Sequence, residues 1–193
     1  MSRGGLARSI AARVLALLAA LLAVFLVVGL LLPRRVEVTR SLPVPAAPEA
    51  IFPYLEDLEA WTEWTPWGEV ESEVQGHSSG PGATRIWDDP AFGSGSLTLL
   101  EVERPVRVTY RAVLEDGGIR FEGELRVEPT ESGATVIWTE AMGWGWNPLL
   151  GWTSLGLEGS QGRQLGGALV RLRDVVVEDR EPAASPPVGG QGR

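Results

Sequence analysis

Three segments with alternating apolar and polar residues constrain the fold of this chain more than any other feature. Residues 106–114, 119–128 and 134–142 each place an apolar side chain at nearly every second position, and turn sequences such as Asp116-Gly117-Gly118 separate them. Because successive side chains of a strand point to opposite faces, these segments predict an antiparallel meander with one apolar and one charged face. The apolar face requires a covering element.

The covering element predicted from the sequence is one long helix over Asn147 to Glu178. Asn147 is a good helix cap, and Pro148 suits the first turn, where no amide donor is needed. Apolar residues between Leu165 and Val176 recur at the spacing of one helical face. The preceding portion, residues 151–167, is rich in glycine, which costs roughly 1 kcal/mol per residue relative to alanine. We therefore expect this helix to depend on the sheet, with the missing side-chain volume forming either a ligand cavity or a close helix-sheet contact.

The segments before the meander add further strands and two short helices. A strand is expected over residues 35–42, a helix over residues 48–57 and a shorter helical piece over residues 59–64. Short alternating runs between residues 69 and 103 predict more strands. Three tryptophans spaced three apart, Trp61, Trp64 and Trp67, predict an aromatic cluster, for which packing is favoured over ligand contact.

The amino-terminal leader has the length and composition of a membrane span. Residues 14–32 are uninterrupted in apolar character and are flanked by arginines. This run is longer than the core of a secretory signal, and Leu31-Leu32-Pro33-Arg34 lacks a small-x-small cleavage site, so an uncleaved single-pass anchor is preferred to a cleaved signal peptide. The basic groups before the run narrowly outweigh those after it, which favours a domain on the extracytoplasmic side.

Composition divides the chain and excludes several kinds of chemistry. The 193 residues form an anchor over 1–34, one domain over 35–179 and a polar tail over 180–193 that is expected to be disordered. The formal net charge is −8, with the leader basic and the domain acidic, which argues against nucleic-acid binding. There is no cysteine and one histidine, His77 in a Gly/Ser loop, so we expect no metal site and no cofactor.

The order of elements resembles a known superfamily. The matching stretches are residues 47–52 (APEAIF), 61–67 (WTEWTPW) and 133–138 (GATVIW). On these, residues 36–177 resemble the START-like, helix-grip superfamily, also called SRPBCC, and within it the polyketide cyclase/dehydrase-like group. The resemblance implies an α+β fold in which a curved antiparallel sheet of about seven strands grips a long carboxy-terminal helix. It also implies a hydrophobic cavity between sheet and helix, since members bind lipids, sterols or polyketides and only some are enzymes.

Candidate ligand-binding residues lie on the apolar strand faces and at the start of the facing helix. Together they could line a cavity with few polar groups, although core packing explains them equally well. They are Trp87, Tyr110, Phe121, Trp138, Glu140, Met142, Trp152 and Leu155. Glu140 shares a strand face with Trp138 and is the sole candidate for catalysis. An exposed strand-end carboxylate is the favoured interpretation of Glu140, and a buried group with a raised pKa is the alternative.

Three functions are compatible with these features. The first is a membrane-anchored binding module for a hydrophobic small molecule or lipid, held through residues 14–32, and the absence of a full catalytic set favours it over an enzyme. The second is an enzyme like a polyketide cyclase or aromatase that uses Glu140. The third is a protein-interaction domain at the membrane, which would use the tryptophans of Gly143-Trp144-Gly145-Trp146 and whose protein partner the sequence does not identify.

Overall fold

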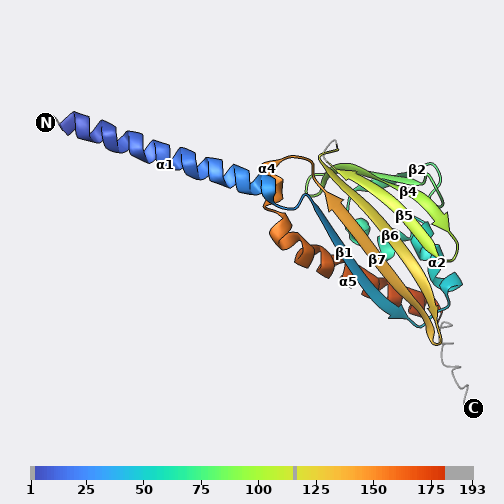
Figure 1. The fold of residues 1–193 in the computed structure, drawn as a ribbon. Coiled ribbons are helices and arrows are strands. Elements are labelled where there is room, and N and C mark those ends of the chain that lie inside the picture. Colours follow the sequence, from blue (N-terminus) through green and yellow to red (C-terminus); the bar gives the residue numbers. More distant parts are fainter. Residues whose placement is uncertain (1–2, 115–116, 181–193) are drawn as a thin grey trace, which may run out of the picture.

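The computed structural model describes residues 3–114 and 117–180, and for residues 3–9 it describes the backbone only. The predicted disorder of residues 180–193 falls outside these ranges except at Arg180. The elements, labelled in Figure 1, are α1 (Arg3–Leu31), β1 (Arg35–Val44), α2 (Pro48–Glu56), α3 (Trp61–Trp64), the 3-10 helix η1 (Pro66–Glu69), β2 (Ser72–Gln75), β3 (Thr84–Asp89), β4 (Gly93–Glu103), β5 (Arg107–Leu114), β6 (Ile119–Thr130), β7 (Gly133–Gly143), α4 (Pro148–Gly151) and α5 (Ser154–Glu178).

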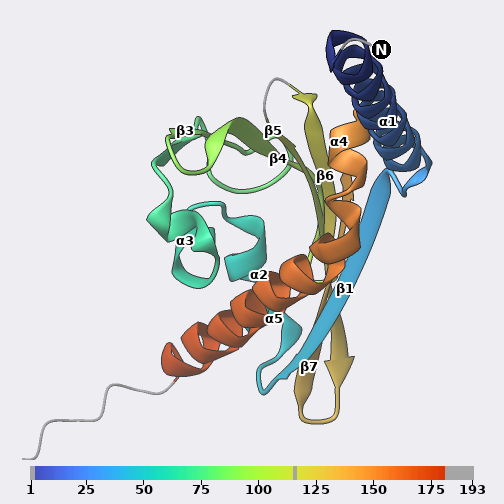
Figure 2. The same ribbon diagram turned by 90° about the vertical axis from the view of Figure 1, so that its left-hand side faces the viewer.

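The strands form one curved antiparallel sheet of seven strands in the order β1-β7-β6-β5-β4-β3-β2. Strands β4 to β7 form a meander in which each strand pairs with the next one in the chain. Strand β1 pairs with β7, so the first strand of the chain forms the edge of the sheet next to the last strand. Figure 2 shows α5 crossing the open side of the curved sheet, with α2 and α3 beside it. The predicted α+β helix-grip fold is confirmed.

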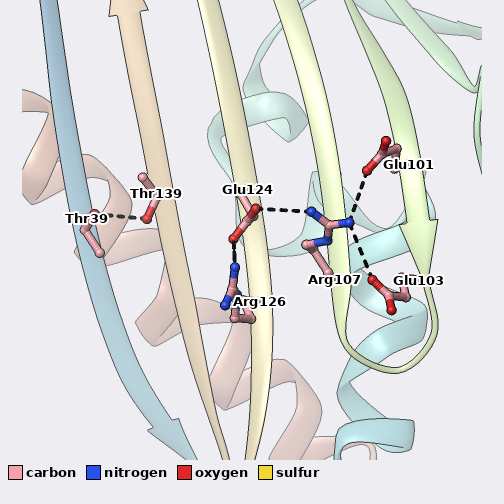
Figure 3. Close-up of polar contacts among 7 residues, drawn as sticks. All are labelled: Thr39, Glu101, Glu103, Arg107, Glu124, Arg126 and Thr139. Carbon is pink, nitrogen blue, oxygen red and sulfur yellow. Dashed lines mark hydrogen bonds and ion pairs between the residues drawn. The ribbon is translucent and has the colours of Figure 1, made fainter.

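The outer face of the sheet is charged and solvated, as the alternation predicts (Figure 3). Arg107 on β5 lies 3.2 Å from Glu101 on β4 and 3.7 Å from Glu124 on β6, and the hydroxyls of Thr39 and Thr139 are 2.9 Å apart across β1 and β7. Exposed ion pairs of this kind contribute little stability each, typically about 0–1 kcal/mol. Their main consequence is that this face stays in water and the opposite face is left for the core.

Trp61 and Trp64 form part of the core and are almost completely buried. Their indole nitrogens donate to the carbonyl oxygens of Leu55 (2.9 Å) and Tyr54 (3.0 Å), which satisfies the polar atom of each ring and ties α3 to α2. The two rings lie 5.4 Å apart. Trp67 departs from this pair and packs against Trp87 of β3, with ring centroids 4.7 Å apart.

The predicted continuous helix over residues 147–178 is wrong in its first part. Asn147 does cap a helix, since its Oδ1 accepts from the amide of Leu149 at 2.9 Å, but that helix ends at Gly151 and α5 begins at Ser154. Gly151 packs against Gly29 of α1, where an added Cβ would lie 2.0 Å from the Gly29 carbonyl oxygen. The break lets α4 pack on the leader helix while α5 packs on the sheet. Leu165, Leu169 and Leu172 bury the predicted apolar face of α5.

The leader forms one helix that projects away from the domain (Figure 1). Its segment Ile10–Leu31 is long and apolar enough to cross a membrane, and almost all of it is exposed. A signal sequence near an amino terminus can also meet these criteria of length and hydropathy, so the helix is consistent with both interpretations of the leader.

Candidate ligand cavity

A cavity of about 250 Å³ lies between the inner face of the sheet, α3 with η1, and the first half of α5. Its wall is predominantly apolar and aromatic, with a few polar groups contributed by η1, β7 and α5. The lining residues are Trp61, Thr65, Pro66, Trp67, Val70, Trp87, Phe92, Leu97, Tyr110, Ala112, Leu114, Phe121, Trp138, Glu140, Gln161, Gln164, Leu165 and Ala168. A mainly apolar hollow with a few convergent polar groups is typical of small-molecule sites.

A chain of hydrogen bonds crosses one wall of the cavity and ends on Glu140. The indole nitrogen of Trp138 donates to the Tyr110 hydroxyl at 2.9 Å, and this hydroxyl donates to Oε1 of Glu140 at 2.5 Å. From the opposite side, the side-chain amide of Gln161 on α5 donates to Oε2 of Glu140. One carboxyl group thus links β5, β7 and α5 around the cavity.

Burial controls the protonation of this group. Glu140 is 8% exposed, and its removal from water raises the pKa of its carboxyl, although the hydrogen bonds from Tyr110 and Gln161 oppose the shift. Burial, followed by the adjacent Glu140 carboxylate, raises the pKa of Tyr110 well above its usual value. Tyr110 therefore keeps its proton, and the Glu140 carboxyl holds its proton to a higher pH than an exposed glutamate does.

Two of the aromatic rings in the wall lie directly over glycines of neighbouring strands. Tyr110 pairs with Gly123 across β5 and β6, and a Cβ on Gly123 would lie 2.0 Å from the tyrosine ring. Trp87 pairs with Gly95 across β3 and β4, where an added Cβ would lie 2.4 Å from the indole. The absence of a side chain at each glycine lets the ring lie flat across the adjacent strand.

Five of the residues proposed from the sequence lie around this cavity: Trp87, Tyr110, Phe121, Trp138 and Glu140. The favoured expectation that Glu140 is an exposed strand-end carboxylate is wrong, because the Tyr110 ring and α5 cover it. That these five residues bind a ligand stays a prediction.

The structure places the other three candidates outside the cavity wall. Met142 is half-buried near the end of β7. Trp152 stacks on Phe25 of α1, with ring centroids 4.9 Å apart, and Leu155 is 68% exposed at the start of α5. The sequence places Trp152 and Leu155 at the cavity only if the helix is unbroken, and the break after Gly151 redirects both.

Several wall residues are not among the candidates drawn from the sequence, above all Trp61, Trp67, Phe92, Gln161 and Gln164. In the sequence, the spacing of Trp61 and Trp67 is better explained by packing, so neither is a candidate for ligand contact. The two glutamines stand three apart in the glycine-rich half of α5, which is the spacing of one helical face, and that is the signal that could have found them.

The glycine-rich half of α5 also contacts the sheet closely. At Gly162 a Cβ would lie 1.9 Å from the Arg40 guanidinium of β1, so the Arg40 side chain packs directly against the helix backbone there. The cavity lies beside the same half of the helix. This half of the helix therefore borders both a hollow and a close helix-sheet contact, and that the hollow holds a ligand stays a prediction.

The part of the chain that the structure describes contains no group of His, Asp and Glu side chains arranged to hold a metal ion. His77 lies in an exposed loop, with its Nε2 atom 3.2 Å from the carbonyl oxygen of Pro81. The ionisable and amide side chains among the residues that line the cavity are Glu140, Tyr110, Gln161 and Gln164.

The fold and the cavity define a helix-grip protein. Residues 35–177 match the family described as "Polyketide cyclase / dehydrase and lipid transport", and the chain belongs to this family. No sequence among the curated proteins matches the chain significantly.

Three solved structures illustrate the likeness in fold. An uncharacterised protein from Rhizobium leguminosarum is 14% identical with a TM-score of 0.56, over 75% of this chain and 95% of its own. StfQ, a di-domain aromatase/cyclase from the steffimycin biosynthetic pathway, is 15% identical with a TM-score of 0.59, over 75% of this chain and 51% of its own. A norcoclaurine synthase mutant from Thalictrum is 12% identical with a TM-score of 0.56, over 75% of this chain and 96% of its own. At these identities the likeness extends to the fold alone.

Proposed function

We propose that this protein is a membrane-anchored binding module for a hydrophobic small molecule or lipid, held in the cavity between the sheet and α5. The observation that carries the proposal is the cavity itself, about 250 Å³ of mainly apolar space in an otherwise packed core. Protein interiors are normally packed as densely as organic crystals, so a hollow of this size is unusual unless something occupies it. The apolar segment Ile10–Leu31 supports the anchor and would keep the domain beside a source of apolar molecules.

The cavity limits the size and polarity of the ligand. Its 250 Å³ falls just below the range of about 300–1,000 Å³ for sites of drug-sized ligands, so it suits a compact ring system or one short chain and cannot enclose a two-chain lipid. Glu140, Gln161 and Gln164 gather the polar groups on one side of the cavity. We therefore propose a small apolar molecule with one hydroxyl or amine that hydrogen-bonds to Glu140.

Filling the cavity tests this proposal. In Ala112→Phe, a ring would enter the cavity from β5, whereas Thr139→Phe adds the same ring on the outer face of β7. Native mass spectrometry of the full chain, gently purified in detergent, should show a co-purifying small molecule in the wild type and in Thr139→Phe but not in Ala112→Phe. The same molecule retained by Ala112→Phe, or none in the wild type, would contradict the proposal.

A second candidate function is acid-base catalysis on a polyketide-like substrate. It is favoured by the buried Glu140, since burial raises the pKa of this carboxyl towards the range in which a group can donate and accept a proton. Turnover of a poly-β-ketone thioester by the wild type, lost in a Glu140→Gln variant that stays folded by circular dichroism, is the expected result for an enzyme. No turnover by the wild type would count against catalysis on this substrate class, and equal turnover by the variant would exclude Glu140 as the catalytic group.

A further inference from the structure

A second hollow, of about 560 Å³, lies where the leader helix joins the sheet. It is bordered by the start of β1, the turn before β6 and the segment that follows β7. Its wall includes Arg34, Arg35, Arg120, Gly143, Trp144 and Gly145. None of these residues lines the ligand cavity, so the two sites are separate.

The hollow is basic within an acidic protein. Three arginines and one acid, Glu122, are the charged groups among its described lining residues, whereas the whole chain has a formal net charge of −8. Arg35 lies 3.5 Å from Glu122, but both side chains are more than half exposed, so water screens this pair. The guanidinium of Arg34 lies 3.1 Å above the centre of the Trp146 ring, which fixes it beside the hollow. The local field therefore favours an anion.

Trp144 supplies an independent indication of a ligand. Its side chain is 3% exposed, and its indole nitrogen has no hydrogen-bond partner among the described residues. A buried N–H donor without an acceptor is costly, so native proteins nearly always supply one. Gly145, beside it, has no atom within 4 Å of where a Cβ would lie, which leaves open space there. An oxygen anion seated in the hollow would provide the acceptor that the indole lacks.

The position of the hollow beyond the end of the leader helix points to a membrane lipid as the source of the anion. It lies immediately beyond Leu31, the last residue of α1, and α1 is fixed there because Phe25 stacks on Trp152 and Gly29 packs on Gly151. Trp146 is 74% exposed in its wall, and tryptophan and arginine at the end of an apolar helix are typical of the headgroup layer of a bilayer. The hollow thus lies at the depth of lipid phosphates around a membrane-spanning α1.

We infer that this hollow binds the phosphate of an anionic phospholipid headgroup, with Arg35 and Arg120 donating to its oxygens and Arg34 adding positive charge. Guanidinium groups suit this role, because their planar N–H pairs match phosphate oxygens. The inference rests on the membrane anchor in the proposed function but not on the ligand cavity. Bound in this way, the lipid would fix the orientation of the domain against the bilayer surface.

The test is native mass spectrometry of the full chain in mild detergent, titrated separately with phosphatidylglycerol, phosphatidylcholine and inorganic phosphate. We expect saturable phosphatidylglycerol adducts and at least a tenfold weaker affinity in the double variant Arg35→Gln/Arg120→Gln. The matched control is Arg107→Gln/Arg126→Gln, which removes two arginines from the outer face of the sheet and should bind as the wild type does. Trp144→Phe keeps an aromatic ring, removes the unpartnered N–H and should weaken binding about threefold.

Each alternative result overturns a defined part of the inference. Equal phosphatidylglycerol binding by the wild type and Arg35→Gln/Arg120→Gln, or equal loss in both double variants, would exclude this hollow as the site. Inorganic phosphate that displaces the lipid at equal concentration would show a soluble phosphate site instead of a lipid site. Extraction of membranes with alkaline carbonate tests the anchor separately: release of the chain would overturn the anchor, whereas a retained chain without a preference for phosphatidylglycerol would overturn only the headgroup site.

Discussion

The hydroxyl of Tyr110 donates to Oε1 of Glu140 across 2.5 Å, and this contact joins the middle of the sheet to its last strand at the cavity wall. The same hydroxyl accepts from Trp138, and Gln161 of α5 holds the other carboxylate oxygen. A cavity that only separated sheet from helix would not need this network. Its presence places one ionisable group, with fixed partners, beside apolar space.

The first prediction is that Glu140 makes the fold less stable as pH rises. Burial raises the pKa of Glu140 above the ordinary value of 4.5, so between these two pKa values the folded chain holds a proton that the unfolded chain has lost. The contribution of Glu140 to the free energy of unfolding therefore falls as pH rises through this window, and it is constant below the window. Glu140→Gln should remove this loss, which amounts to about 1.4 kcal/mol for each pH unit between the folded and unfolded pKa values.

The measurement for this prediction is urea unfolding of both proteins in detergent from pH 4 to pH 8. The stability gained by Glu140→Gln relative to the wild type should grow with pH. Glu37→Gln, an exposed position on β1, is the matched control and should follow the wild type. A gain that is the same at every pH would show that the two donated hydrogen bonds offset burial and that the pKa of Glu140 is not raised.

The second prediction concerns the loss of the Tyr110 hydroxyl. Tyr110→Phe leaves the Trp138 indole without its acceptor and Glu140 with one donor fewer, both in a buried site. An unsatisfied buried polar group costs about 1–3 kcal/mol, so the free energy of unfolding should fall by that amount. Tyr54→Phe is the control, because Tyr54 donates to Asp179 at the exposed end of α5 and should cost less than about 1 kcal/mol. Equal losses in denaturant titrations of the two variants would contradict the buried network.

The third prediction concerns the glycine beneath the Tyr110 ring. Gly123→Ala would place a methyl group 2.0 Å from that ring, and the ring would have to move towards the cavity. Overpacking of this kind typically costs about 1–3 kcal/mol, and here it should also reduce the cavity and weaken ligand binding. Gly145→Ala, in the second hollow and away from this cavity, meets open space and should change neither the stability nor the retention of the cavity ligand. Thermal unfolding and retention of the co-purifying molecule give the two measurements, and wild-type values for Gly123→Ala would show that Tyr110 is free to shift.

The strands of the sheet are predictable from the sequence because each one has its own alternation of apolar and polar residues. Alternation in residues 106–114, 119–128 and 134–142 determines which side chains share a face, and this pattern alone places Tyr110 and Glu140 on the inward faces of their strands. It does not show that Glu140 is covered. The burial of Glu140 depends on Tyr110 from a strand that is not its neighbour and on Gln161 from α5, and such contacts leave no periodic signal.

The region around α4 is not predictable for a related reason. Asn147 and Pro148 give a true helix start, and the pattern between Leu165 and Val176 gives a true helix, but neither reports the break between them. That break coincides with the contact of Gly151 with Gly29, two small residues far apart in the sequence. A prediction that omits this break places Trp152 and Leu155 at the ligand cavity, whereas both lie outside its wall.

The last prediction is that the contact of α1 with α4 and Trp152 holds the domain in a fixed orientation on the leader helix. Phe25 stacks on Trp152, and the indole nitrogen of Trp152 donates to the Phe25 carbonyl oxygen at 3.3 Å. The chain contains no cysteine, so the pair Phe25→Cys/Trp152→Cys can be introduced without background and should react in high yield with a short thiol-to-thiol cross-linker in liposomes. At Gly29 even an added Cβ would lie 2.1 Å from the Pro148 carbonyl oxygen, so the larger side chain of Gly29→Val should separate α1 from α4 and abolish the cross-link. The pair Phe25→Cys/Leu100→Cys, with Leu100 on β4, is the control and should not react. Cross-linking that survives Gly29→Val would mean that the domain is held to the leader by other contacts.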